Sequence, residues 1–257
     1  MLFRSIRSLL RCAQTSRSWR SLVSAELRRR FAHILRRFFG DRSADFLHVL
    51  SVHGAIISGS TALAFLSSPD RWCPGDMDVY VGCDNYRQFL QALHDYRLAA
   101  FASDTGSRGS SSSGGISAVR RYTTPTCERL DVIQSITPNP VHPLLYFWGS
   151  LVVNFLTPRG AVCAYPSHTL NHKAFATDIS YSPKLLAARE KYESRGFEFH
   201  TVDSWRPARL NAPEGSRVFA VGPILYADFQ SKWLTNSAPL PIVHAGKNWV
   251  LSPDLPS

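Results

Sequence analysis

Two aspartates in alternate positions, Asp76 and Asp78, follow a glycine–serine pair at Gly59 and Ser60. The aspartates open the run from Asp76 to Val81, whose other members are mostly apolar, and this pattern predicts a strand. Successive side chains of a strand point to opposite faces, so the two carboxylates project to one side, roughly 6 to 7 Å apart. We expect them to converge on a hard divalent cation, Mg²⁺ or Mn²⁺, which binds carboxylate oxygens, water and substrate phosphates.

The glycine–serine pair suits the phosphates of such a ligand. Gly59 lets the backbone approach a phosphate closely, and the run from Thr61 to Leu66 predicts a short helix whose first N–H groups favour an anion. Two ions about 3.5 to 4 Å apart activate an attacking hydroxyl and neutralise a leaving pyrophosphate. The residues therefore predict a metal-dependent phosphate site, and the alternative is a turn that enters an ordinary strand.

The arrangement resembles the DNA polymerase beta-like nucleotidyltransferase superfamily, whose signature is an apolar residue, Gly-Ser, a spacer and an Asp-x-Asp or Asp-x-Glu flanked by apolar residues. Here Ile57 precedes the pair by two positions, Val79 and Val81 supply the apolar flank, and the spacer, residues 61 to 75, is longer than usual. The resemblance implies an α/β (α+β) fold with a mixed sheet flanked by helices. It also implies transfer of a nucleoside monophosphate from a nucleoside triphosphate to an unnamed acceptor, with Gly59 and Ser60 on the terminal phosphates.

The superfamily uses a third carboxylate on a later strand, and Asp131 is the candidate for it. Asp131 is the only acid in the strand-like run from Arg129 to Ile133. An unpaired carboxylate is costly to bury without a cation or hydrogen bonds, which makes Asp131 a candidate third metal ligand that helps to position the attacking hydroxyl. The alternative is an ion pair with Arg120, Arg121 or Arg129 on a half-exposed strand.

The segments around these motifs predict the helices and strands that position them. Asp84 is expected to cap one helix, and Thr105 to Gly115, rich in serine and glycine, predicts a mobile loop. Expected helices span Ala44 to His53, Thr61 to Ser67, Asn85 to Tyr96, Val141 to Leu156 and Ser182 to Ser194. Expected strands span Met77 to Gly82, Ile116 to Thr124, Glu128 to Ile136 and Gly196 to Thr201, with one strand or helix within Val218 to Phe229.

A later segment offers further groups for a triphosphate, after Tyr165 and Pro166. Its cationic and polar side chains are expected either to meet the phosphates or to form a solvated helix end, and the second interpretation is favoured. The residues are His168, Asn171, His172 and Lys173.

The net charge of +10 is concentrated at the N-terminus. Residues 1–42 hold eleven arginines against two acids, a net charge of +9, whereas residues 43–257 hold eighteen Lys or Arg against seventeen acids. A body this close to neutrality carries no general basic footprint for long nucleic acid.

Three interpretations of residues 1–42 stay open. The favoured one is an amphipathic helical hairpin that packs on the main domain through apolar side chains between Trp19 and Phe38. In the second, residues 9 to 23 look like the second half of an F-box without its Leu-Pro opening, which implies a ubiquitin-ligase adaptor as partner. In the third, the arginine- and serine-rich start is a mitochondrial presequence. From about residue 9 to about residue 200 the chain is similar to uncharacterised proteins of mushroom-forming fungi with a degenerate F-box-like N-terminus.

Length and composition predict one main domain with additions: the basic helical segment 1–42, the nucleotidyltransferase-like domain 43–201 and an irregular C-terminal region 202–257. The five cysteines form no C-x-x-C pair, and neither G-x-S-x-G nor H-E-x-x-H occurs. Polar residues and a proline interrupt the longest apolar run, so no membrane span is expected. We expect an intracellular protein, cytoplasmic or nuclear, with mitochondria as the alternative. A catalytically silent fold that serves as an interaction module is the functional alternative.

Overall fold

The structure is a computed structural model that describes residues 6–67, 72–104, 114–176, 182–201 and 225–229. Most of the Ser/Gly segment 105–115 and most of the region after residue 201 lie outside these ranges. The α-helices are α1 (Ile6–Thr15), α2 (Arg17–Phe39), α3 (Ser43–Val52), α4 (Gly59–Leu66), α5 (Tyr86–Asp95), α6 (Pro166–Thr169) and α7 (Pro183–Glu193), and the 3₁₀ helices are η1 (Gly40–Arg42), η2 (His142–Tyr146) and η3 (Ser150–Val152). The strands are β1 (Ile56–Ser58), β2 (Asp76–Val81), β3 (Ala100–Asp104), β4 (Ile116–Thr123), β5 (Arg129–Ser135), β6 (Phe155–Thr157), β7 (Gly160–Cys163), β8 (Lys173–Ala176), β9 (Glu198–Thr201) and β10 (Leu225–Asp228).

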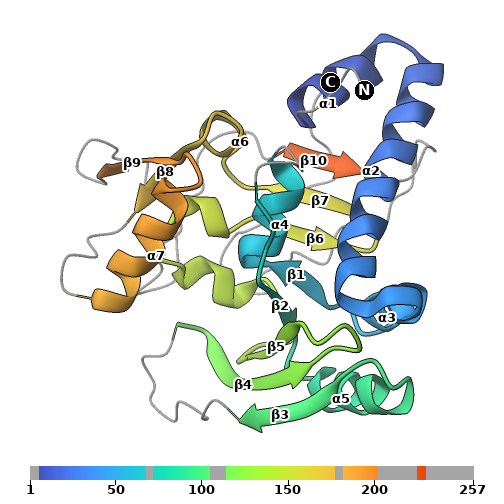
Figure 1. Ribbon diagram of the computed structural model, residues 1–257. Helices are drawn as coiled ribbons and strands as arrows, with labels where there is room; N and C mark the ends of the chain where they lie inside the picture. The colour runs from blue at the N-terminus through green and yellow to red at the C-terminus, as the bar shows by residue number, and fades with distance from the viewer. Residues whose placement is uncertain (1–5, 68–71, 105–113, 177–181, 202–224, 230–257) are drawn as a thin grey trace.

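The expected mixed α/β architecture is confirmed (Figure 1). Eight strands form one sheet in the order β10-β7-β6-β1-β2-β5-β4-β3, and β2 and β5 form its parallel pair. The strands on either side of this pair, β1 and β4, run antiparallel to it. β8 and β9 form a separate parallel pair, which α7 connects. In Figure 1, α7 with β8 and β9 lies to the left and α2 with α3 to the right, with β1, β2 and α4 between them.

The two faces of the central strands have different partners. Met77, Val79 and Val81 of β2 are fully buried in the main hydrophobic core together with side chains of α2, α3, α4 and α5. The alternate positions of β2, including Tyr80, face a second cluster of apolar side chains from η2, β6 and β7. The period of two along a strand therefore separates a packed face from a face that carries the acidic residues.

The N-terminal helices pack on the main core. Val23, Leu27, Phe31, Leu35 and Phe38 of α2 are each at most 3% exposed and belong to the main cluster. The predicted packing of this helix is thus confirmed for its central and C-terminal turns. Near its N-terminus the structure differs, because the Trp19 and Leu22 side chains are 42% and 60% exposed.

One predicted helix is wrong. Residues 141–156 form η2, η3 and the first residues of β6 instead of one core helix. Pro143 has no N–H to donate within a helix, and Gly149 lies in extended backbone. Asn154 is fully buried; its side-chain amide donates to the Leu151 carbonyl and its Oδ1 accepts from the Ala164 N–H. These side-chain bonds to the backbone hold a turn where the apolar composition alone favours a helix.

Smaller differences concern helix starts. Asn85, without a side-chain hydrogen bond to the helix, is the N-cap of α5, and Asp84 instead accepts from Cys83 Sγ at 3.1 Å, so the predicted Asp84 cap is wrong. The helix expected from Thr61 begins at Gly59. Within the described ranges, no helix combines the length and the apolar character that crossing a bilayer requires.

Candidate functional site

The parallel pairing of β2 with β5 brings the three predicted carboxylates to one face of the sheet. The register aligns Asp78 with Asp131 and Asp76 with Arg129. Asp76 and Asp78 project to the same side because they alternate along β2. All three acidic residues line a single cavity of about 570 Å³.

The turn from β1 into α4 completes this end of the cavity. Gly59 has a φ of +65° and is followed by Ser60, and both residues line the cavity. The Ser60 hydroxyl donates to Asp76 Oδ1 at 3.3 Å, and the Thr61 hydroxyl donates to the Asp76 main-chain carbonyl at 2.9 Å. Two hydrogen bonds therefore hold the glycine–serine turn against the start of β2.

Gly59 is also packed against an acidic side chain. A Cβ atom at position 59 would lie 2.5 Å from Asp78 Oδ2, far inside van der Waals contact. The positive φ strains any other residue at this position, and an added Cβ would displace the Asp78 carboxylate. Gly59 thus fixes the space in which the Asp78 carboxylate lies.

Two arginines compensate part of the negative charge. Arg121 of β4 donates to Asp131 through Nε at 2.9 Å and Nη2 at 3.3 Å. Arg129 Nη2 lies 2.5 Å from Asp76 Oδ2 and 3.2 Å from Asp131 Oδ2, so one guanidinium bridges two strands. Of the alternatives considered for Asp131, the structure has ion pairs with Arg121 and Arg129, whereas Arg120 pairs with Asp104.

The Asp78 carboxylate is compensated less well. It accepts no hydrogen bond from the described part of the chain, and Asp78 itself is half-buried. Burial and the charges of Asp76 and Asp131 raise the pKa of Asp78 to about 7, against the opposing effect of Arg129 and Lys191. Asp78 is the acidic group of the cavity with the most to gain from an added cation.

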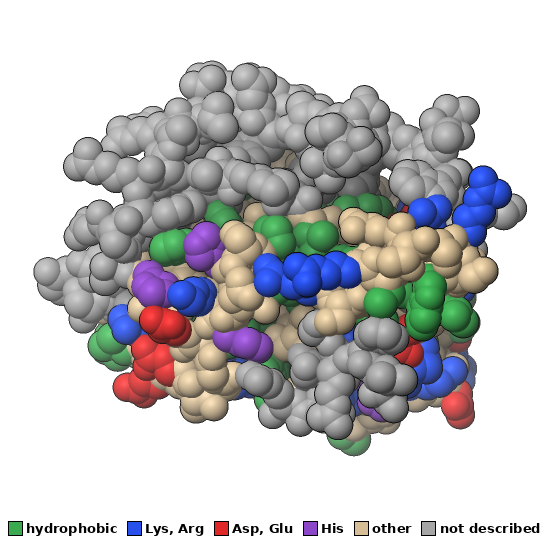
Figure 2. Space-filling view, turned by 90° about the horizontal axis from the view of Figure 1, so that it is seen from above, with side chains coloured by type: hydrophobic (Ala, Val, Ile, Leu, Met, Phe, Trp, Pro, Cys, Tyr) green, Lys and Arg blue, Asp and Glu red, His purple; other side chains and the backbone are tan. Residues whose placement is uncertain are grey.

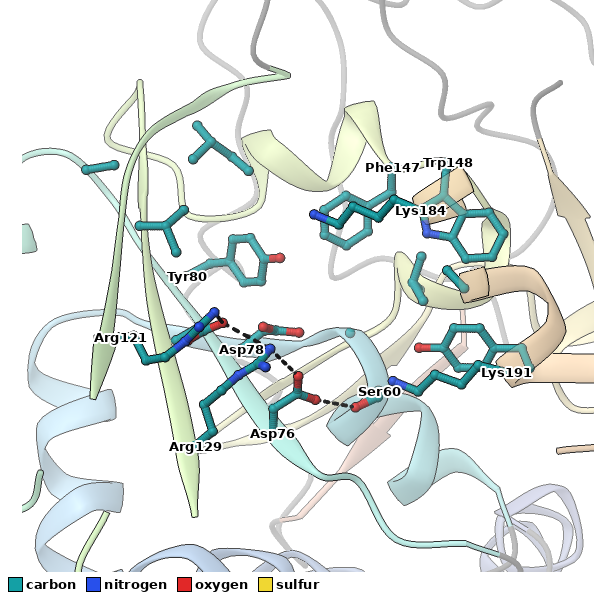
Figure 3. Close-up of a pocket in the computed structure, with 18 residues that line it drawn as sticks. Ser60, Asp76, Asp78, Tyr80, Arg121, Arg129, Phe147, Trp148, Lys184 and Lys191 are labelled. Atoms are coloured by element: carbon teal, nitrogen blue, oxygen red, sulfur yellow. Dashed lines mark hydrogen bonds and ion pairs between the residues drawn. The ribbon is translucent and has the colours of Figure 1, made fainter. Parts of the chain in front are cut away.

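The opposite wall of the cavity comes from α7 and the loop between η2 and η3. Lys184 and Lys191 reach in from α7, and their ammonium groups point into the cavity (Figure 3). Phe147 and Trp148 line the same wall. The Tyr192 ring lies beside Trp148, with ring centroids 6.2 Å apart. One end of the cavity is therefore acidic, and the facing wall is cationic and aromatic.

Tyr80 lies between the two walls. Burial, with the Asp78 charge next in effect, raises the pKa of Tyr80 well above its usual value. Its phenol therefore stays neutral and can donate a hydrogen bond to a ligand oxygen.

The donor set fits a hard divalent cation. Asp76, Asp78 and Asp131 offer oxygen ligands on one face, and the Asp78 carboxylate is open to the cavity. As they stand, no three acidic, histidine or cysteine side chains in the described residues converge closely enough to hold an ion by themselves. A bound cation would draw the carboxylates together and would compete with the arginines for them.

The five predicted site residues, Gly59, Ser60, Asp76, Asp78 and Asp131, all line the cavity. The later segment that offered histidines and Lys173 does not contribute to its lining. Sequence reasoning missed the α7 lysines and the aromatic pair. A weak signal for the lysines was present: Lys184 and Lys191 are seven residues apart, which places them on one face of a helix.

The comparisons with known proteins give no relative for this chain. No family model, no curated protein and no solved structure matches it. The function of this chain is therefore inferred from the geometry of the cavity.

Proposed function

We propose that the protein is a metal-dependent nucleotidyltransferase that transfers a nucleoside monophosphate from a nucleoside triphosphate to an acceptor hydroxyl. The observation that carries the proposal is that an acidic wall and a basic wall face each other across the cavity. Asp76, Asp78 and Asp131 lie on one wall of the cavity, and Lys184 and Lys191 lie on the other. A divalent metal with a polyphosphate has the matching distribution of positive and negative charge.

The roles of the residues follow from their chemistry. Asp76 and Asp78 would hold Mg²⁺ or Mn²⁺, and Asp131 would help to orient the acceptor hydroxyl. When bound, the metal supplies charge neutralisation at the transferring phosphate and lowers the pKa of the attacking hydroxyl. Gly59 and Ser60 leave room for the terminal phosphates at the turn, and the lysines donate to phosphate oxygens as mobile point charges.

The aromatic wall supports a nucleotide over a bare polyphosphate. Phe147 and Trp148 are partly exposed to the cavity, and stacking of a base on an aromatic ring is worth about 1 to 3 kcal/mol. Trp148 is held by stacking on Phe199, with ring centroids 5.8 Å apart and an interplanar angle of 19°. A ring that is already fixed loses little conformational freedom when a base binds.

The distribution of charge bears on the class of acceptor. In Figure 2, basic, acidic and histidine side chains are interspersed on the face shown instead of forming one continuous basic patch. With a charge near zero, residues 43–257 carry no general basic footprint for long nucleic acid, and the proposal names the acceptor only as a hydroxyl.

A second function is supported by different observations. Arg121 and Arg129 stabilise the carboxylates without a metal, and Trp19 and Leu22 are exposed on α2. These features suit a catalytically silent interaction module that binds a partner, such as a ubiquitin-ligase adaptor, through α2. Adaptor capture that is lost in a Trp19→Ala, Leu22→Ala variant would favour this alternative.

Transfer itself can be tested directly. The full chain is incubated with Mg²⁺ or Mn²⁺, each α-labelled nucleoside triphosphate and a cell extract as acceptor source. We expect label to enter an acceptor and pyrophosphate to be released, and both signals to be lost in an Asp76→Asn, Asp78→Asn variant. Asp84→Asn is the matched control, because Asp84 follows the same strand but is exposed and lies outside the cavity lining. Label transfer that persists in the double variant would exclude this site.

A further inference from the structure

Arg129 contacts two of the three carboxylates that line the cavity. Its Nη2 atom contacts Asp76 Oδ2 at 2.5 Å and Asp131 Oδ2 at 3.2 Å, which joins the carboxylates of two neighbouring strands. Both carboxylates are largely buried, with side chains 20% and 9% exposed, whereas the Arg129 side chain is 45% exposed. The guanidinium therefore reaches the acidic residues from the open side of the site.

The same contacts occupy oxygen atoms of two of the three acidic residues. Asp76 accepts from Ser60 and Arg129, and Asp131 accepts from Arg121 and Arg129. Asp78 accepts no hydrogen bond from the described residues, although it is the central acid of the three. Oxygen atoms that are engaged by a guanidinium cannot simultaneously enter the coordination shell of a metal through the same lone pairs. A metal that used Asp76 Oδ2 would have to displace Arg129.

We propose that Arg129 is an exchangeable resident cation: the guanidinium neutralises Asp76 and Asp131 in the empty site, leaves when a divalent metal binds, and then pairs with a phosphate of the nucleotide. This inference rests on the proposed function. It assigns to Arg129 a positioning role that couples the binding of metal to the binding of substrate.

Arg129 suits this role better than Arg121. Arg121 uses two nitrogen atoms on one carboxylate, a bidentate geometry that is difficult to break. Arg129 makes both of its contacts through a single nitrogen and is half-exposed, so its side chain can turn without losing a buried position. Its backbone is fixed opposite Asp76 in the register of β2 and β5, so a displaced guanidinium remains at the cavity.

The exchange has a measurable consequence. Metal alone must compete with Arg129, so it binds weakly. Metal with a nucleoside triphosphate binds more tightly, because the displaced guanidinium regains an anionic partner. Each ligand therefore raises the affinity for the other by the same factor.

The test measures Mn²⁺ affinity by the electron paramagnetic resonance signal of free Mn²⁺, with and without a non-hydrolysable nucleoside triphosphate. We expect Arg129→Gln to bind Mn²⁺ alone roughly tenfold more tightly than the wild type. We also expect the nucleotide to tighten Mn²⁺ binding much less in this variant. Arg120→Gln, which removes an exposed arginine paired with Asp104 outside the cavity, should behave as the wild type.

The possible failures are distinct. Unchanged or weaker Mn²⁺ binding in a folded Arg129→Gln variant would overturn the exchange and leave the proposed function standing. Mn²⁺ binding that persists in Asp78→Asn, or no Mn²⁺ binding by the wild type even with the nucleotide present, would overturn the metal site and with it both proposals.

Discussion

The Asp78 carboxylate fills the space that any side chain at position 59 would need. The 2.5 Å separation between Asp78 Oδ2 and an ideal Cβ on Gly59 links the two halves of the motif, which lie nineteen residues apart in the sequence. Because Gly59 also has a φ of +65°, its backbone and its surroundings both disfavour a larger residue.

Substitutions at two glycines separate the effect of the positive φ from the effect of the contact with Asp78. Gly59→Ala should lower the free energy of unfolding by more than about 2 kcal/mol and weaken metal binding, because the new methyl group displaces the Asp78 carboxylate. Gly54→Ala is the matched control, since Gly54 has a φ of +60° but no atom within 4 Å of an added Cβ. The control substitution should lower the free energy of unfolding, measured with urea, by about 1 kcal/mol and leave metal binding intact. Equal losses of stability at both positions would show that the contact with Asp78 adds nothing to the destabilisation.

The raised pKa of Asp78 predicts a pH dependence of stability. With a folded-state pKa of about 7 against an ordinary value of 3.8, the folded chain holds an extra proton between these pH values. The free energy of unfolding should therefore fall as pH rises through this window and level off above pH 7. Asp78→Asn should remove this contribution and stabilise the metal-free protein at pH 8 by roughly 1 to 3 kcal/mol.

Urea unfolding of both proteins at several pH values checks this prediction. Added Mn²⁺ should reduce the pH dependence of the wild-type free energy of unfolding, since a bound cation favours the ionised Asp78 carboxylate. Identical pH profiles for the wild type and Asp78→Asn would show that Asp78 is not protonated in the folded state.

The α7 lysines should set nucleotide affinity. Replacing Lys184 and Lys191 by Gln together should weaken triphosphate binding roughly 10- to 100-fold in calorimetric titrations, because each lysine donates a charge-assisted bond to phosphate. The free energy of unfolding should change by less than about 0.5 kcal/mol, since both side chains are exposed. Lys173→Gln, an exposed lysine at the start of β8 outside the cavity lining, should leave affinity unchanged. A loss of affinity in the control alone would place the phosphates elsewhere.

Glu26 should stabilise α2 through its arginines. Bonds from Arg29, with Arg30 contributing further, hold the pKa of Glu26 at about 2, and the Arg30 side chain is only 5% exposed. Glu26→Gln should cost about 1 to 3 kcal/mol at pH 7. Because the pKa is depressed, this cost should shrink as the pH falls from 4.5 toward 2. The exposed pair of Glu193 with Arg189 is the control, and Glu193→Gln should cost less than about 0.5 kcal/mol.

Features set by neighbouring residues could be predicted from the sequence. The alternation from Asp76 to Val81 fixes which side chains share a face, and the lone acid of the second strand indicated Asp131. Both strands lie within one residue of their expected ends. Residues 141–156 do not form the predicted helix, because the hydrogen bonds that the Asn154 side chain makes to the backbone leave no trace in the apolar composition of the segment.

Features set by distant contacts could not be predicted. Lys191 lies more than a hundred residues beyond Asp78, and an exposed helical lysine has the same sequence signature whether it faces solvent or a cavity. The bridging position of Arg129 depends on the parallel pairing of β2 with β5, which puts it opposite Asp76. The sequence offered three arginines as partners for Asp131, and only the register distinguishes them.

The most direct test of the central claim is thermal unfolding of the full chain with Mg²⁺ or Mn²⁺ and each nucleoside triphosphate. The full chain is required because α2 contributes to the main core. At ~100 times its dissociation constant, a bound nucleotide should stabilise the folded state by about 2.7 kcal/mol. We predict a metal-dependent increase in Tm with at least one nucleotide, absent from the Asp76→Asn, Asp78→Asn variant. No increase with any nucleotide, or an equal increase in the variant, would contradict a nucleotidyltransferase site at these carboxylates.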